Sequence, residues 1–226
     1  ESHLRSVFQN FTSLESLFLR SHTILDFEFV SCNNSNNLRS LYFDSCDHVV
    51  GDAYYSFGRF APLLEELHIT YCTNLTDLSS IAECRKLKVL HLGENVNITD
   101  EKLRALQPLG NTLETLQLSH FLVIRDLSLL RGFVNLKVLR LRGCSNVGSA
   151  SFAGVAEMGF VALEELVLSG TQVSDLSAFA RCPRLKVLDL HECTVLSNES
   201  LRTLPQFKAL TDVLLQYTAV SDLSPL

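Results

Sequence analysis

The sequence has no tryptophan, one methionine and five prolines, and aromatic residues make up only 8% of its 226 residues. Hydrophobic residues nevertheless make up 46% of the chain, so the apolar mass is mainly aliphatic. That amount is enough for a sizeable core and excludes an intrinsically disordered chain. No apolar run approaches the roughly 18 residues that cross a bilayer, so we expect no membrane insertion.

Positive charge is also in the minority, because 19 lysines and arginines face 25 acids, for a net charge of -6. Binding of phosphate backbones or anionic lipids depends on clustered positive charge. The basic residues Arg85, Lys86, Arg181 and Arg184 recur at matching points but are interleaved with acids, which is typical of a solvated surface. We therefore expect no nucleic-acid partner.

An internal repeat dominates the chain. Nine copies appear when the chain is aligned on the pattern Leu-x-x-Leu-x-Leu-x-x-(Cys/Asn/Thr), some with another residue at one of these positions. The spacings between copies alternate strictly between short (22–24 residues) and long (25–27 residues). The unit is therefore a doublet, and only a repeat architecture accounts for two interlocked periods. The copies begin at Leu14, Leu38, Leu64, Leu87, Leu113, Leu136, Leu163, Leu185 and Leu210.

This pattern resembles the leucine-rich repeat family. The long repeats, with Cys46, Cys144 and Cys193 at the ninth position, are similar to the cysteine-containing repeats common in F-box proteins. The short repeats, such as the one ending Val220-Ser221-Asp222-Leu223-Ser224, are similar to the compact repeats of internalin-like and phosphatase-regulator proteins. The resemblance implies an α/β solenoid, a right-handed horseshoe with a parallel sheet on its concave side.

The residue pattern leads to the same architecture. Leu-x-Leu has the period of two that a strand needs, and one repeat is too small to bury its leucines alone, so neighbouring repeats must stack. Thr99 and Ser197, each followed closely by acids, predict capped α-helical returns in the long repeats. The Asp-Leu-Ser returns of the short repeats leave room only for 3₁₀ turns. We expect one repeat domain over residues 1–226, uncapped at both ends and part of a longer protein.

The residue after the first leucine alternates in charge along the repeats, which predicts a charged ladder that fixes strand register. The central outward positions of the strands and the strand ends are expected to have no structural role, so their side chains are available to a partner. Tyrosine and arginine are frequent anchors of protein interfaces. The candidate partner-binding residues on the concave face are Phe18, Tyr42, His68, Tyr71, His91, His120, Arg140 and Arg142.

Catalytic and metal-binding patterns are missing. There is no Cys-x-x-Cys, no His-Glu-x-x-His, no phosphate-binding glycine loop and no Gly-x-Ser-x-Gly. His68 and His91 hold the same position in adjacent repeats, and Glu66 and Glu94 could complete a zinc-like ligand set with them. The pair is more simply interpreted as two imidazoles of a binding surface. We expect no enzyme, no metal and no cofactor.

The seven cysteines are an odd number, and four of them occupy the inward ninth position. We interpret all seven as reduced thiols, which indicates an intracellular, cytoplasmic protein. Five Asn-x-Ser/Thr sequons, at Asn10, Asn33, Asn74, Asn97 and Asn198, point the other way, toward a secreted or surface protein.

These observations favour a protein-interaction scaffold that binds another protein on its concave face. Two alternatives stay open. The cysteine repeats allow the substrate-recognition region of an F-box or RING-type ubiquitin ligase, and the internalin-like repeats and the sequons allow a surface or secreted adhesion domain.

Overall fold

The computed structural model describes residues 13–20, 37–46, 63–95, 97–155 and 160–224. The chain divides into two compact units, Glu1–Leu113 and Glu114–Leu226, and each is described by itself. Cys32 and the sequons at Asn10 and Asn33 lie outside the described residues.

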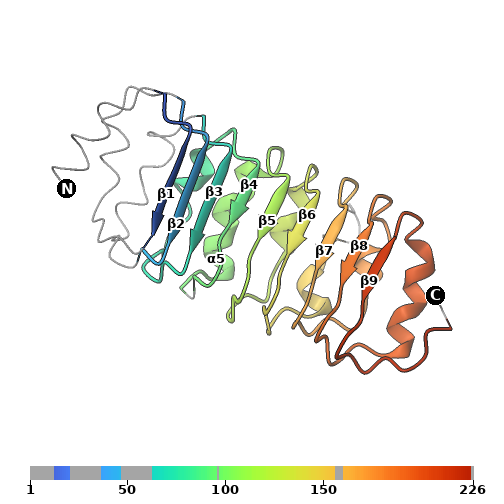
Figure 1. The fold of residues 1–226 in the computed structure, drawn as a ribbon. Helices are drawn as coiled ribbons and strands as arrows, with labels where there is room; N and C mark the ends of the chain where they lie inside the picture. The colour runs from blue at the N-terminus through green and yellow to red at the C-terminus, as the bar shows by residue number, and fades with distance from the viewer. Residues whose placement is uncertain (1–12, 21–36, 47–62, 96, 156–159, 225–226) are drawn as a thin grey trace. The chain divides into compact units, whose positions relative to one another are not determined.

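Each strand begins two residues after the first leucine of a repeat, as the sequence predicts. Within each unit the strands are parallel and follow one another in chain order (Figure 1). The first unit contains β1 (Ser16–Arg20), β2 (Ser40–Asp44), β3 (Glu66–Thr70) and β4 (Val89–His91). The second contains β5 (Thr115–Gln117), β6 (Val138–Arg140), β7 (Glu165–Val167), β8 (Val187–Asp189) and β9 (Asp212–Leu214).

The core of each unit is the leucine face of its sheet. Leu67 and Leu90 are fully buried on adjacent strands of the first unit, as are Leu139 and Leu166 in the second. The residues that alternate with them are half-buried or exposed on the other side, which we call the open face. Because successive side chains of a strand point to opposite faces, the Leu-x-Leu period places the core and the open face without further information.

The returns between strands contain short helices on one side of the strands (Figure 1). Those of the first unit are η1 (Ile81–Glu83), α5 (Asp100–Leu103) and η2 (Arg104–Leu109). Those of the second are η3 (Ser128–Gly132), η4 (Ser149–Phe152), η5 (Ser177–Phe179) and η6 (Asn198–Gln206). No helix in these described ranges has the length and apolar character needed to pass through a bilayer.

Long repeats hold the longest returns, as expected, but the helix type differs from the expectation. Among the described elements only α5, with four residues, is an α-helix, and η6 is a 3₁₀ helix over all nine of its residues. Neither Ser197 nor Thr99 caps its helix with its side chain, and at the start of η6 the Ser197 backbone N–H donates to the Ser200 hydroxyl at 3.2 Å. A 3₁₀ helix rises about 2.0 Å per residue against 1.5 Å for an α-helix, so it spans the repeat with fewer residues.

The ninth position of each described long repeat closes the end of the preceding strand. The Cys144 thiol donates to the Leu118 carbonyl oxygen at 2.8 Å, and the Cys193 thiol donates to that of Leu168 at 3.1 Å. Asn95 does the same with its amide, which donates to the Ile69 carbonyl at 2.7 Å, while its Oδ1 accepts from the Cys72 backbone N–H. The six described cysteines are all buried thiols.

The predicted charge ladder is present in both units. Glu65 pairs with Arg39 on one side and Lys88 on the other, each at 2.7 Å, and these hydrogen bonds hold the pKa of Glu65 below its ordinary value. In the second unit Lys137 pairs with Glu114 and Lys186 pairs with Glu164. These exposed pairs contribute little stability each, but a slip of one repeat would bring like charges together.

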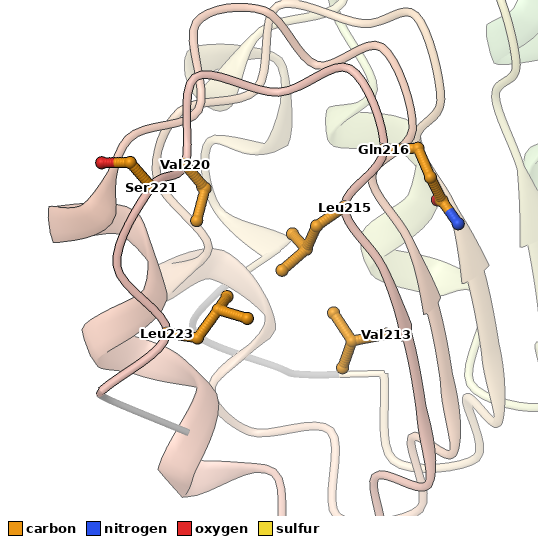
Figure 2. A pocket seen from close by; sticks show the side chains of 6 residues that line it. All are labelled: Val213, Leu215, Gln216, Val220, Ser221 and Leu223. Atoms are coloured by element: carbon orange, nitrogen blue, oxygen red, sulfur yellow. The ribbon is translucent and has the colours of Figure 1, made fainter.

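The last described repeat leaves its core side open. Val213, Leu215 and Val220 are half-buried and Leu223 is exposed, and they line a hollow of about 450 Å³ together with Gln216 and Ser221 (Figure 2). The equivalent residues of the seventh repeat, Leu166, Leu168, Val173 and Leu176, are fully buried. That the ends of the domain are uncapped remains a prediction.

Candidate functional site

The strand register of the first unit aligns the central residues of the open face. Phe18 pairs with Tyr42, Tyr42 with His68, and His68 with His91, so one aromatic or imidazole ring comes from each of four adjacent strands. A parallel in-register sheet repeats the same position about every 4.8 Å, which brings flat side chains within stacking distance. The sequence predicts this row from the repeat period alone.

These four rings form a continuous stack, which we call the ring ladder (Phe18, Tyr42, His68 and His91). The Phe18 and Tyr42 ring centroids lie 4.0 Å apart with planes within 8°. Tyr42 and His68 follow at 4.4 Å, and His68 meets His91 at 4.0 Å edge to face. Phe18 is 68% exposed despite this contact. The ladder therefore presents apolar surface that its own packing already holds in place.

Glu66 anchors the middle of the ladder. Its Oε1 lies 2.8 Å from His68 Nε2, and its Oε2 accepts from the Ser40 hydroxyl at 3.2 Å. Partial burial acts to raise the pKa of Glu66, but hydrogen bonds from Tyr42, His68 and Ser40 outweigh it and lower the pKa below its ordinary value. Burial and the same carboxylate raise the pKa of the Tyr42 phenol. Glu66 thus stays ionised and fixes the orientation of two rings.

In the repeats of β2 to β9, the residue seven places after the first leucine, close to the end of the strand, has left-handed backbone geometry. This corrects the expectation that these positions have no structural role. In the first unit φ is +58° at Ser45, +54° at Tyr71 and +57° at Glu94. The second unit repeats the feature at His120, Gly143, Gly170, Glu192 and Tyr217. We call these residues the strand-end row. Glycine adopts this geometry without strain, and other residues adopt it at a cost.

Tyr71 and Glu94 are neighbours in the strand-end row. The Tyr71 phenol is hydrogen-bonded to Glu94, which raises the pKa of the phenol, and the negative charge of Asp44 adds to the effect. The Tyr71 side chain remains 49% exposed. An exposed aromatic ring is thus flanked by two carboxylates at the ends of β2, β3 and β4.

The second unit holds the other three predicted site residues in a different setting. Arg140 Nε lies 2.7 Å from Glu165 Oε1, so Arg140 is already in an ion pair, whereas Arg142 is exposed. The His120 ring covers Gly143, because a Cβ at Gly143 would lie only 2.3 Å from His120 Nδ1. Ser169, on the open face after β7, is buried. Its hydroxyl has no hydrogen-bond partner within the described ranges.

The zinc-like alternative combined His68 and His91 with Glu66 and Glu94 as metal ligands. His68 and His91 do lie side by side, as predicted, but His68 Nε2 is bound to Glu66. Across the described part of the chain no three histidine, cysteine or acidic side chains are grouped to hold a metal ion.

Sequence reasoning left Glu66 and Glu94 out of the partner-binding residues, although both hold candidate rings. Their positions in the repeat were a usable signal, since Glu66 precedes the central residue by two and Glu94 follows Tyr71 by one repeat. The hydrogen bonds that make them important depend on side-chain conformation, which the repeat period does not encode.

Comparison with known proteins finds one relative of note and no matching family model. The relative is a protein of Trypanosoma equiperdum whose name provisionally assigns it to the regulation of adenylate cyclase. It is 34% identical over 133 residues, which are 58% of this chain. The chain spans about a fifth of that relative's length.

Solved structures are similar over a larger part of this chain. An internalin of Listeria monocytogenes is similar with a TM-score of 0.68 and 23% identity, over 97% of this chain and 66% of the internalin chain. A leucine-rich repeat protein of Leptospira interrogans has a TM-score of 0.61 at 16% identity, over 94% and 57% of the two chains. TLR13, solved in complex with the RNA ssRNA13, has a TM-score of 0.61 at 21% identity, over 97% and 35%. The chain therefore has the leucine-rich repeat fold.

Proposed function

We propose that this chain is a protein-interaction module and that its partner protein binds the open face of the first unit. The observation that carries the proposal is the ring ladder. It exposes aromatic surface on the side of the sheet that the core does not use, in a fold that presents a repeated surface to partners.

The energetics of the ladder support a binding role. Buried aromatic side chains dominate the energy of most protein interfaces, and those that are already ordered lose little conformational entropy on binding. Tyr42 and His68 are held by neighbouring rings and by Glu66, so a partner would not have to order them. Phe18 and Tyr71 add the exposed area.

A protein is favoured over RNA as the partner. TLR13 was solved in complex with ssRNA13, and stacked rings are a surface on which bases can stack. Nucleic-acid binding, however, also needs a positively charged path for the phosphates. The open face of the first unit instead places Asp44, Glu66 and Glu94 beside the rings.

The trypanosomal relative is compatible with this proposal. Its name describes regulation of an enzyme, which a binding module can perform without chemistry of its own. We propose no catalytic activity for this chain and extend the relative's name no further, because the match covers only a fifth of that protein.

We further propose an intracellular location. Six thiols are buried in the described part of the chain, and burial raises the pKa of Cys144 to about 11 and that of Cys84 to about 12. In two of the sequons the asparagine side chain makes hydrogen bonds within the chain, which accounts for the asparagine without glycosylation. The Asn97 amide donates to the Thr73 carbonyl, and Asn198 Oδ1 accepts from the backbone N–H groups of Ser221 and Asp222.

The experiment is affinity capture from source-cell lysate with mass spectrometry. The bait is the wild-type chain beside a ring variant in which Tyr42, His68, Tyr71 and His91 are serine. A matched control variant replaces four exposed polar residues away from the open face, Gln107, Asn111, Gln172 and Gln206, with serine. Circular dichroism verifies that all three fold.

A partner held by the wild type and the control but lost by the ring variant supports the proposal. A partner that all three retain contradicts it and moves the binding site to the returns or the loops.

A further inference from the structure

The open face of the first unit has an excess of negative charge. Its described strand and strand-end positions contain one cation, Arg20, and three carboxylates, Asp44, Glu66 and Glu94. Arg20 pairs with Asp44, with Nε 2.7 Å from Oδ2. Phenol, hydroxyl and imidazole groups are the donors to Glu66, and the Tyr71 phenol bonds to Glu94. A cation from a partner would therefore be attracted to this face.

The carboxylates converge around one exposed ring. The Tyr71 backbone N–H donates to the Gly93 carbonyl oxygen at 3.1 Å, which places Glu94 beside Tyr71, and Asp44 pairs with Thr70 in the strand register. The Tyr71 phenol is hydrogen-bonded to Glu94, and the charge of Asp44 acts on the same phenol. Tyr71 is exposed, and all three residues lie at the carboxyl ends of adjacent strands. A planar cation can stack on such a ring while donating hydrogen bonds to the flanking carboxylates.

The backbone of this cluster is unfavourable for the side chains it carries. Tyr71 and Glu94 adopt φ of +54° and +57°, where the second unit has glycine at two of its five equivalent positions, Gly143 and Gly170. Glycine is therefore compatible with the repeat, and the two side chains are present at a conformational cost. Strained residues of this kind cluster at binding sites.

We propose that Tyr71, Glu94 and Asp44 form a subsite for an arginine side chain of the partner protein. This inference rests on the proposed function and specifies its partner chemistry. Arginine fits better than lysine because its guanidinium is planar, stacks on aromatic rings and donates two parallel hydrogen bonds to a carboxylate. An arginine of the chain itself, Arg20, already forms an ion pair with Asp44 on this face.

The probe is the peptide acetyl-Gly-Ser-Arg-Ser-Gly-amide, added to the isotope-labelled chain while backbone amide signals are followed by NMR. Two matched peptides carry lysine or citrulline in place of arginine, since citrulline keeps the shape and removes the charge. We expect saturable shifts at Thr70, Tyr71, Gly93 and Glu94 with the arginine peptide, smaller shifts with lysine and none with citrulline.

Three variants test which side chains of the chain bind the arginine peptide. Glu94→Gln should weaken binding of the arginine peptide about two- to fivefold, as expected for one exposed ion pair. Tyr71→Leu should weaken it further by removing the ring. Glu101→Gln, an exposed acid on α5 with the same change in net charge, should leave the affinity unchanged.

Equal binding of arginine and citrulline peptides, or equal loss in Glu94→Gln and Glu101→Gln, would overturn the subsite. No peptide shift at the strand-end row would overturn it as well. These outcomes differ from failure of the proposed function, because lysate capture can still depend on the ring ladder when the arginine peptide does not bind.

Discussion

Tyr71 and Gly143 occupy the same position of their repeats, and both have left-handed backbone geometry, with φ of +54° and +69°. Tyr71 has a large exposed phenol where Gly143 has no side chain. The repeat therefore determines the left-handed backbone geometry at this position, whichever side chain the position carries. A side chain at this position should lower the stability of the fold and provide surface for binding a partner.

The first prediction concerns this backbone geometry. Tyr71→Gly should unfold at a higher temperature than Tyr71→Ala, because only glycine relieves the left-handed strain. The order should reverse at Tyr42 in the centre of β2, where Tyr42→Gly should be the less stable variant. Thermal unfolding of the four variants checks this, and the same order at both positions would contradict the account.

Gly143 should be intolerant of a side chain. Gly143→Ala adds left-handed strain and a Cβ 2.3 Å from His120 Nδ1, so it should lower the free energy of unfolding by about 1–2 kcal/mol. Gly132→Ala is the control, because a Cβ there meets nothing within 4 Å. Urea denaturation compares the two, and equal effects would show that position 143 is unconstrained.

Asn95 should be the most sensitive polar residue of the first unit. Asn95→Ala leaves the buried Ile69 carbonyl and Cys72 N–H without their partners, which should cost about 2–4 kcal/mol. Asn95→Cys should recover part of this loss, because Cys144 and Cys193 satisfy the equivalent carbonyl with a thiol. Urea denaturation of both variants measures the difference, and equal losses would exclude this role for the thiols.

The charge ladder should make stability depend on pH. Hydrogen bonds from Lys88 and Arg39 lower the pKa of Glu65 below its ordinary 4.5, and Lys186 does the same for Glu164. A lowered folded-state pKa gives stability that is present above the unfolded-state pKa and lost as pH falls through the folded-state pKa. The melting temperature should therefore fall as pH drops below about 4.5. Glu65→Gln should reduce the slope, and 0.5 M salt should weaken it in both proteins.

The buried cysteines should be unreactive in the folded chain. Burial raises the pKa of Cys84 to about 12 and that of Cys182 to about 11, so neither forms the reactive thiolate at pH 8. A thiol reagent should label the six described cysteines only after unfolding. Seven thiols counted in denaturant without a reductant would support the intracellular proposal, and paired cysteines would contradict it.

The repeat period predicted the fold well because each consequence depended on sequence spacing alone. Leu67 and Leu90 are buried and His68 and His91 lie side by side because of a period of two within strands and a fixed offset between them. The left-handed backbone at Tyr71 and Glu94 was missed, because its sequence signal is not at these residues but in the glycines at the equivalent positions of other repeats, Gly143 and Gly170.

The contacts of individual side chains were not predicted from the sequence either. Arg140 was predicted as an anchor for a partner but pairs with Glu165 on the next strand. Ser169 lies on the open face and is nevertheless buried. Both outcomes depend on rotamers and neighbouring volumes, which differ from repeat to repeat.

Site-specific photo-crosslinking tests the central claim most directly. A photoreactive benzoylphenylalanine replaces Tyr71 on the open face or, as the control, Gln107 in the returns, and each protein is irradiated in source-cell lysate. The account predicts a crosslinked partner protein from position 71 and none from position 107. The same partner crosslinked from position 107 alone would contradict it.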